Sequence, residues 1–275
     1  MGVSAQRGVF MKAIGSAGFL IAGIAIAYAQ ADLAPTGTLR AAYLATNPAQ
    51  AIRDAHTGEV RGVSFDLARE LAKKIGKPLD FKPIASPPVV IDAVRSGQAD
   101  IGFVAYEATR LGTVEFSQTY MLVQQSFLVL GDSPIHAVAD IDRIGQKVSG
   151  TYNDSITLCL RRTLKQATLV ELDNNPELIA KALASREIDA LGANRQRLTT
   201  LMKSVPGSRL LPDNFFNVPQ NIVVPMDKPE ILASINAFID DLRTSGFLGD
   251  AVARSGVVGI EAAPKSLGSQ HGCPG

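Results

Sequence analysis

Strand and helix patterns alternate along this chain, and their order is the strongest constraint on its fold. The first run predicts three strands and two helices, at 38–43, 64–75, 79–83, 89–96 and 101–105. The same order then recurs, at 147–149, 155–166, 168–172, 176–185 and 190–192. Strands that alternate with helices are typical of a parallel sheet covered by helices. The sequence therefore predicts an α/β fold built from two similar halves.

Two longer apolar segments have the character of strands that cross between the halves, at 123–130 and 217–224. They divide the chain into a first lobe of 36–124 plus 222–262 and a second lobe of 125–221. Two crossings form a hinge, and a ligand cleft is expected between hinged lobes.

The two ends of the chain predict export and a loose tail. Arg7 and Lys12 precede an apolar run with small residues before its end, which is typical of a cleavable signal peptide, here residues 1–29. A single membrane anchor is the alternative, although the run is shorter than the ~20 residues that spanning needs. Cleavage changes the formal charge from +1 to −1, so no nucleic-acid partner is expected, and we predict a periplasmic location. Residues 263–275 contain Pro, Gly and Ser among polar residues and predict a disordered tail.

The cysteines and histidines give no sign of a metal site. Cys159 lies in a predicted helix and Cys273 in the tail, so we expect two separate thiols, although export makes a disulfide possible. His56, His136 and His271 are scattered through loop-like segments and are expected at the surface. Their spacing matches no set of metal ligands, and no cofactor is expected.

One arginine follows the third predicted strand. The segment 96–100 reads as a helix end and turn, 101–105 as a buried strand, and Arg110 lies in the loop beyond it. A planar cation just past the carboxyl end of a strand can bind a carboxylate by two parallel hydrogen bonds. The alternative is a surface ion pair with Glu107 or Glu115.

Four motifs in order resemble a known family. They are Gly-Val-Ser-Phe-Asp-Leu-Ala at 62–68, Ser-Gly-Gln-Ala-Asp at 96–100, the spacing from arginine to Phe-Ser at 110–117, and Gly-Asp-Ser-Pro at 131–134. The chain thus resembles the family 3 extracellular solute-binding proteins of bacterial ABC transporters. The resemblance implies a two-lobed type II periplasmic binding fold, in which helices flank a mostly parallel sheet in each lobe and two strands form the hinge. It also implies a non-catalytic monomer that binds a small carboxylate ligand and docks on an inner-membrane ABC permease.

The resemblance carries particular roles to particular residues. Arg110 takes the place of the arginine that binds the ligand carboxylate. Asn153, Asp154 and Ser155 take the place of a turn at a helix N-terminus, where backbone N–H groups meet the anion. Asp154 could instead serve as a helix cap, or contact a hydroxyl or amine of the ligand.

Three further positions in the site depart from the family pattern. Asn194 stands where amino-acid binders carry an aspartate for the α-ammonium, Asn47 begins the segment that replaces an aromatic lid, and Tyr106 replaces a small hydroxyl residue. An amide supplies no negative charge. The expected ligand is therefore a small organic acid, or a modified amino acid whose amine is masked or absent. A shift of the alignment would give the aspartate role to Asp189 instead.

Two other functions remain open at this point. On a dehydratase-like enzyme of the same scaffold, Glu107 could act as a general acid with Asp154 as its partner. A ligand-sensing module would need no chemistry at all. We expect a receptor and not an enzyme, because no pair of nucleophile and base is evident.

Overall fold

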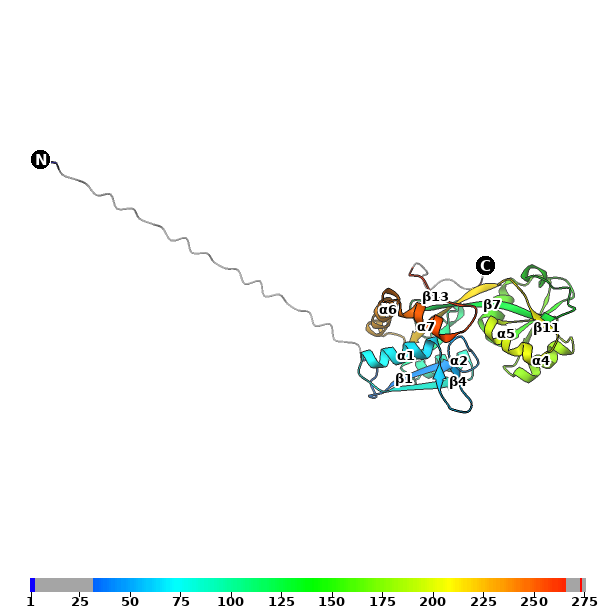
Figure 1. Ribbon diagram of the computed structural model, residues 1–275, viewed down its shortest axis with the longest axis horizontal. Helices are drawn as coiled ribbons and strands as arrows, with labels where there is room; N and C mark the ends of the chain where they lie inside the picture. The colour runs from blue at the N-terminus through cyan, green and yellow to red at the C-terminus, as the bar shows by residue number, and fades with distance from the viewer. Residues whose placement is uncertain (3–31, 266–272, 274–275) are drawn as a thin grey trace. The chain divides into compact units, whose positions relative to one another are not determined.

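The computed structural model describes residues 1–2, 32–265 and Cys273 (Figure 1). Residues 32–265 belong to one compact unit. Most of the predicted signal peptide and most of the predicted tail lie outside the described residues. The tail begins with Ala263, which is buried and whose N–H donates to the carbonyl of Tyr120.

The first half of the unit confirms the predicted alternation of strands and helices. Its parallel strands β4, β1 and β5 are Leu79–Ile84, Leu39–Leu44 and Ile101–Ala105. Its helices are α1 (Val63–Lys74), α2 (Pro87–Arg95), α6 (Pro229–Thr244) and α7 (Phe247–Ser255). Smaller elements are β2 (Ile52–Arg53), β3 (Val60–Arg61), η1 (Ala108–Arg110) and β6 (Glu115–Phe116). In Figure 1 the blue and cyan β1, β4 and α1 lie together with the orange α7, so a late helix packs with the first strands of the unit.

The second half repeats the arrangement. Its parallel strands β10, β8 and β9 are Ala190–Asn194, Lys147–Thr151 and Thr168–Leu172. Its helices are α3 (Ser155–Thr163), α4 (Pro176–Ala184) and α5 (Arg195–Leu201). Smaller elements are η2 (Val138–Asp140), η3 (Met202–Ser204) and β11 (Ser208–Leu210).

Two long antiparallel strands join the halves. They are β7 (Met121–Leu130) and β12 (Phe216–Val224), and β13 (Ile260–Ala262) pairs with the start of β7. The main sheet runs β4-β1-β5-β12-β7-β10-β8-β9, so each half keeps a parallel group and the crossing strands lie between the groups. This topology confirms the predicted fold class. Separate apolar clusters form the cores of the two halves, one built around Leu67 and Ile101 and another around Leu183 and Leu198.

The start of α1 differs from its prediction. Ser64 was expected to cap the helix, but Gly62 precedes the first turn and Ser64 is fully buried within it, with its Oγ 2.8 Å from the hydroxyl of Tyr120. Gly62 has φ 136°, and a Cβ there would lie 2.7 Å from the carbonyl oxygen of Gln50. The close passage of the segment at Gln50 therefore requires glycine at this position.

A second glycine positions α3. A Cβ on Gly192 in β10 would lie 2.8 Å from Cδ1 of Ile156 and 2.9 Å from Cε1 of Phe127. The missing side chain lets α3 pack directly on the strand. The first turn of α3 is thereby held beside the carboxyl ends of β8 and β10.

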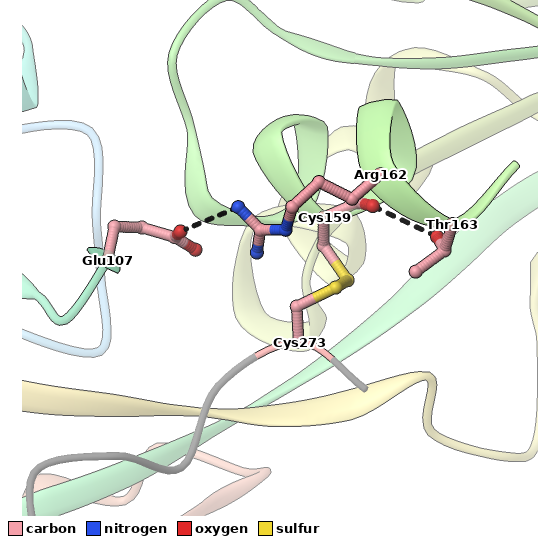
Figure 2. The surroundings of a disulfide bond; sticks show 5 residues. All are labelled: Glu107, Cys159, Arg162, Thr163 and Cys273. Atoms are coloured by element: carbon pink, nitrogen blue, oxygen red, sulfur yellow. Dashed lines mark hydrogen bonds and ion pairs between the residues drawn. A yellow bond between two sulfur atoms is a disulfide. The ribbon is translucent and has the colours of Figure 1, made fainter. Parts of the chain in front are cut away.

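The two cysteines form a disulfide, and the expectation of separate thiols was wrong. Cys159 on α3 is fully buried and is bonded to Cys273 over a Cα–Cα distance of 5.2 Å (Figure 2). Residue patterns could not predict this bond, because they do not show where a residue 114 positions beyond α3's cysteine lies in the fold. The bond closes a loop of 114 residues.

Removal of this bond should destabilise the protein. A cross-link over a loop of this length restricts the unfolded chain, so we expect Cys273→Ser to lower the free energy of unfolding by about 2–4 kcal/mol. Urea titration followed by circular dichroism measures the change. A reducing agent should bring the wild type to the same value and leave the double Cys159→Ser/Cys273→Ser variant unaffected. Equal unfolding midpoints for the oxidised wild type and Cys273→Ser would contradict the prediction.

Candidate ligand-binding site

Arg110 lies at the end of η1, where it contacts both halves of the unit. Its side chain is buried, with Nη1 donating to the carbonyl of Ala105 at 2.7 Å and Nη2 to the carbonyl of Asn153 at 2.9 Å. Asn153 has φ 60°, a left-handed conformation that asparagine tolerates better than most residues. Burial lowers the pKa of Arg110, and the negative charges of Glu107 and Asp154 partly offset this shift. No described carboxylate lies within salt-bridge distance of Arg110, so the alternative of an ion pair with Glu107 or Glu115 does not hold.

A cavity of about 50 Å³ lies beside this guanidinium, lined by the ends of β1, β5 and β10, the start of α3 and the crossing strands. Five of the predicted site residues line it: Asn47, Arg110, Asp154, Ser155 and Asn194. Tyr106 and Asn153 are not among the lining residues. The ring of Tyr106 instead packs edge-on against Phe116, with 5.3 Å between centroids, and Asn153 contributes its carbonyl to Arg110.

Two of the predicted amides hold each other across the cavity. Asn194 caps α5 by accepting the N–H of Arg197 at 2.8 Å, and its Nδ2 donates to Oδ1 of Asn47 at 3.0 Å. Asp189, the alternative for the ammonium role, does not line the cavity, since it precedes β10 and accepts the N–H of Lys147. Asn194, and not Asp189, therefore lines the cavity.

Asp154 precedes α3 at the capping position, but its carboxylate makes no capping bond. It accepts from Nη1 of Arg197 at 3.1 Å instead. Arg197 is buried, and its Nη2 also donates to Oδ1 of Asn174 at 2.7 Å. Asn174 in turn donates to Oγ1 of Thr46 and so connects this group to the first half. Burial raises the pKa of Asp154 and lowers that of Arg197, while each charge opposes the shift of the other.

Ser155 begins α3 and presents an unused hydroxyl. The residue is 8% exposed and lines the cavity, and its Oγ has no hydrogen-bond partner in the described chain. An unpaired buried polar atom is costly, so the hydroxyl is expected to bind a ligand group. Among the described residues, no cluster of His, Cys, Asp and Glu is arranged to hold a metal ion.

Glu107 is buried but does not line the cavity. Its Oε2 accepts from Nη1 of Arg162 at 3.3 Å, beside the disulfide, as Figure 2 shows. Burial raises the pKa of Glu107, and Arg162 and Arg110 oppose that shift.

The raised pKa predicts an unusual pH dependence. A carboxyl whose folded pKa exceeds its unfolded value stabilises the fold at low pH, and this stability is lost as the pH rises through the folded pKa. Relative to Glu107→Gln, the wild type should therefore lose unfolding free energy from about pH 4.3 upward. Urea titrations from pH 4 to pH 8 measure the difference, and the exposed Glu187→Gln serves as the matched control. A difference of the opposite sign would mean that the ion pair with Arg162 outweighs burial.

A family model for bacterial extracellular solute-binding proteins, family 3, matches residues 39–254. That match covers most of the chain, including both halves and both crossing strands.

The chain belongs to the family 3 bacterial extracellular solute-binding proteins.

Solved relatives of this family 3 protein share its fold. An ancestral arginine-binding protein bound to glutamine is 25% identical, with a TM-score of 0.68 over 80% of this chain and 98% of that one. An ancestral amino-acid-binding protein, described as a precursor of cyclohexadienyl dehydratase, is 23% identical, with a TM-score of 0.66 over 80% of this chain and 95% of that one. The second likeness concerns the fold alone.

A curated relative of the family 3 protein is the glutamine-binding protein of Geobacillus stearothermophilus. It is 29% identical over 176 residues, which are 62% of this chain and 66% of the relative, just under two thirds of its length. Within the described part of this chain, no helix is both long and apolar enough to cross a bilayer.

Sequence reasoning about this family 3 protein missed several residues that line the cavity. They are Thr46, Gln50, Gln125, Arg197 and Gln220 among the polar ones. Arg197 lies three residues beyond Asn194, in the first turn of a short helix that was not predicted. Recognition of Asn194 as a helix cap would have placed Arg197 on that turn.

Proposed function

We propose that this protein is the periplasmic receptor of an ABC importer and binds a small organic acid that carries no free ammonium. The lobes would be 36–124 plus 222–262 and 125–221, hinged at β7 and β12. Closure around the ligand would present the paired lobes to an inner-membrane permease. A bound ligand that contacts both lobes supplies the differential affinity that closure requires.

The charges that line the cavity support this ligand class. Only Arg110, Asp154 and Arg197 among the described lining residues are ionisable. Asp154 and Arg197 neutralise each other, whereas Arg110 binds only backbone carbonyls. One unmatched positive charge remains, and a guanidinium that uses two of its five donors can still bind a carboxylate with others.

An amino-acid zwitterion fits this cavity less well than a simple acid. Its carboxylate would pair with Arg110, but its ammonium would find Asp154 already bound by Arg197 and the neutral Asn194 in the expected aspartate position. A buried ammonium without a counter-charge is costly. The single observation that carries the proposal is therefore the unmatched charge of Arg110 beside a cavity whose one acid is already paired.

Two measurements test the proposal. Native mass spectrometry of protein purified without denaturation should reveal a co-purified acid. Calorimetric titration should then rank propionate and hydroxypropionates above alanine, serine and glutamine. Affinities in the micromolar to nanomolar range, about 8–12 kcal/mol, are expected for the true ligand. If a standard α-amino acid binds most tightly, the proposed ligand class is wrong.

A further inference from the structure

The floor of the cavity is a stripe of four side chains on one face of the crossing strands. In the register of β7 and β12, Val218 lies opposite Val123, with Gln220 and Gln125 on either side of this pair. All four line the cavity, and both glutamines are more than nine-tenths buried. The floor thus has a polar end, an apolar middle and a second polar end.

Hydrogen bonds fix the orientation of the amide at the first end. The backbone N–H of Leu44 donates to Oε1 of Gln50 at 2.9 Å, so Nε2 of Gln50 is the atom that donates to Oε1 of Gln220 at 3.0 Å. Nε2 of Gln220 is left with no partner in the described chain. Gln220 is paired with Ala105, whose carbonyl accepts from Arg110, and both Gln220 and Arg110 line the cavity. Arg110 and Gln220 can therefore bind one acid group together.

The amide at the second end presents an acceptor. Nε2 of Gln125 faces the carbonyl of Val123 at 3.5 Å, and a carbonyl can only accept, so Oε1 of Gln125 points elsewhere. Oε1 has no hydrogen-bond partner among the described residues. Gln125 is paired with Asn194, which also lines the cavity, so two neutral amides lie side by side at this end.

We propose that Gln125 selects a hydroxyl group on the ligand, so that the substrate class is a short monocarboxylic hydroxy acid. This inference rests on the proposed function, because it takes the acid group to be held by Arg110. A hydroxyl donates to Oε1 of Gln125 and can accept from Ser155, whose Oγ also lacks a partner. A methyl group would leave the Gln125 acceptor unpaired, and an ammonium would meet no negative charge.

The size of the cavity fits the same class. A volume of about 50 Å³ accommodates only a few water-sized groups, at roughly 10–15 Å³ each. Acids of two to four carbons are the matching ligands, whereas a long or aromatic acid would hold the halves apart.

Isosteric ligands test the proposal in the full mature protein. Propionate, 2-hydroxypropionate, 3-hydroxypropionate and β-alanine should be titrated by calorimetry. In the wild type, at least one hydroxypropionate should bind about 10- to 100-fold tighter than propionate. Gln125→Met keeps the side-chain length but removes the acceptor. It should reduce that ratio to within about threefold, because propionate no longer leaves an acceptor unpaired and the hydroxyl loses its partner.

Gln124→Met is the matched control, because Gln124 is the neighbouring residue of β7 and does not line the cavity. It should keep the wild-type ratio. Gln125→Leu provides a second apolar replacement, and circular dichroism checks that each variant is folded. Equal affinity for propionate and both hydroxypropionates in the wild type, or an unchanged ratio in folded Gln125 variants, overturns the inference.

The same titrations distinguish a failure of the hydroxyl inference from a failure of the proposed function. If all the acids bind equally and lose affinity in Arg110→Ala, only the hydroxyl inference fails. If β-alanine or alanine binds most tightly, or if no acid binds, the proposed function fails and the inference fails with it.

Discussion

Replacing Arg110 with alanine should weaken binding of the acid by about 2–5 kcal/mol, or roughly 30- to 5,000-fold. The change removes the only unmatched positive charge of the described cavity lining and leaves the ligand carboxylate buried without a partner. It also removes the two bonds by which the side chain joins the carbonyls of Ala105 and Asn153. Both the affinity for the acid and the closure of the lobes should therefore decrease.

Calorimetry and small-angle scattering measure these two effects. Arg110→Lys should fall between the wild type and alanine, because an ammonium keeps the charge but lacks the planar fork. Arg95→Ala is the control, since Arg95 is exposed and pairs only with Asp92 within α2. An unchanged affinity in a folded Arg110→Ala protein would remove Arg110 from the site.

Replacing Asn194 with aspartate should shift the preference of the site from simple acids toward amino acids. A carboxylate at this position can still cap α5 through the N–H of Arg197 and gains a charge-assisted bond to an ammonium. It also repels a second anion in the same small cavity. The ratio of the affinity for alanine to that for propionate should rise more than a hundredfold, which is a change of about 3 kcal/mol or more in relative binding free energy.

The control for this variant adds the same charge elsewhere. Asn214 is exposed and accepts from Nη2 of Arg195, a contact that aspartate would keep. Asn214→Asp should leave the ratio unchanged. If Asn194→Asp binds alanine no better than the wild type does, this position does not face the ligand amine.

Most of the fold could be predicted because its elements carry local patterns. β5 and β9 occupy the residues expected, since each is a short apolar run bounded by turn residues, and α4 begins at the expected Pro176 after its Asn175 cap. Elements without such patterns were missed. For example, α6 ends at Thr244, and α7 begins at Phe247, directly after Gly246.

The site was less predictable because it depends on contacts between residues far apart in the sequence. Arg110 could be singled out from one motif and its spacing. By contrast, Asp154 pairs with Arg197 between two helices of the second half, and Gln50 pairs with Gln220 across 170 residues of sequence, so only the folded structure brings these partners together. A polar residue in a strand reads as solvent-facing by itself, so the glutamines of β7 and β12 gave no sequence signal.

The Cys159–Cys273 bond also constrains how the protein is made. Its two partners are 114 residues apart, so Cys159 is synthesised well before Cys273. In a protein exported to the periplasm, as proposed here, both thiols stay reduced in the cytosol and are oxidised only after export. Expression without export should therefore yield protein that lacks the bond and unfolds at the lower free energy expected of Cys273→Ser.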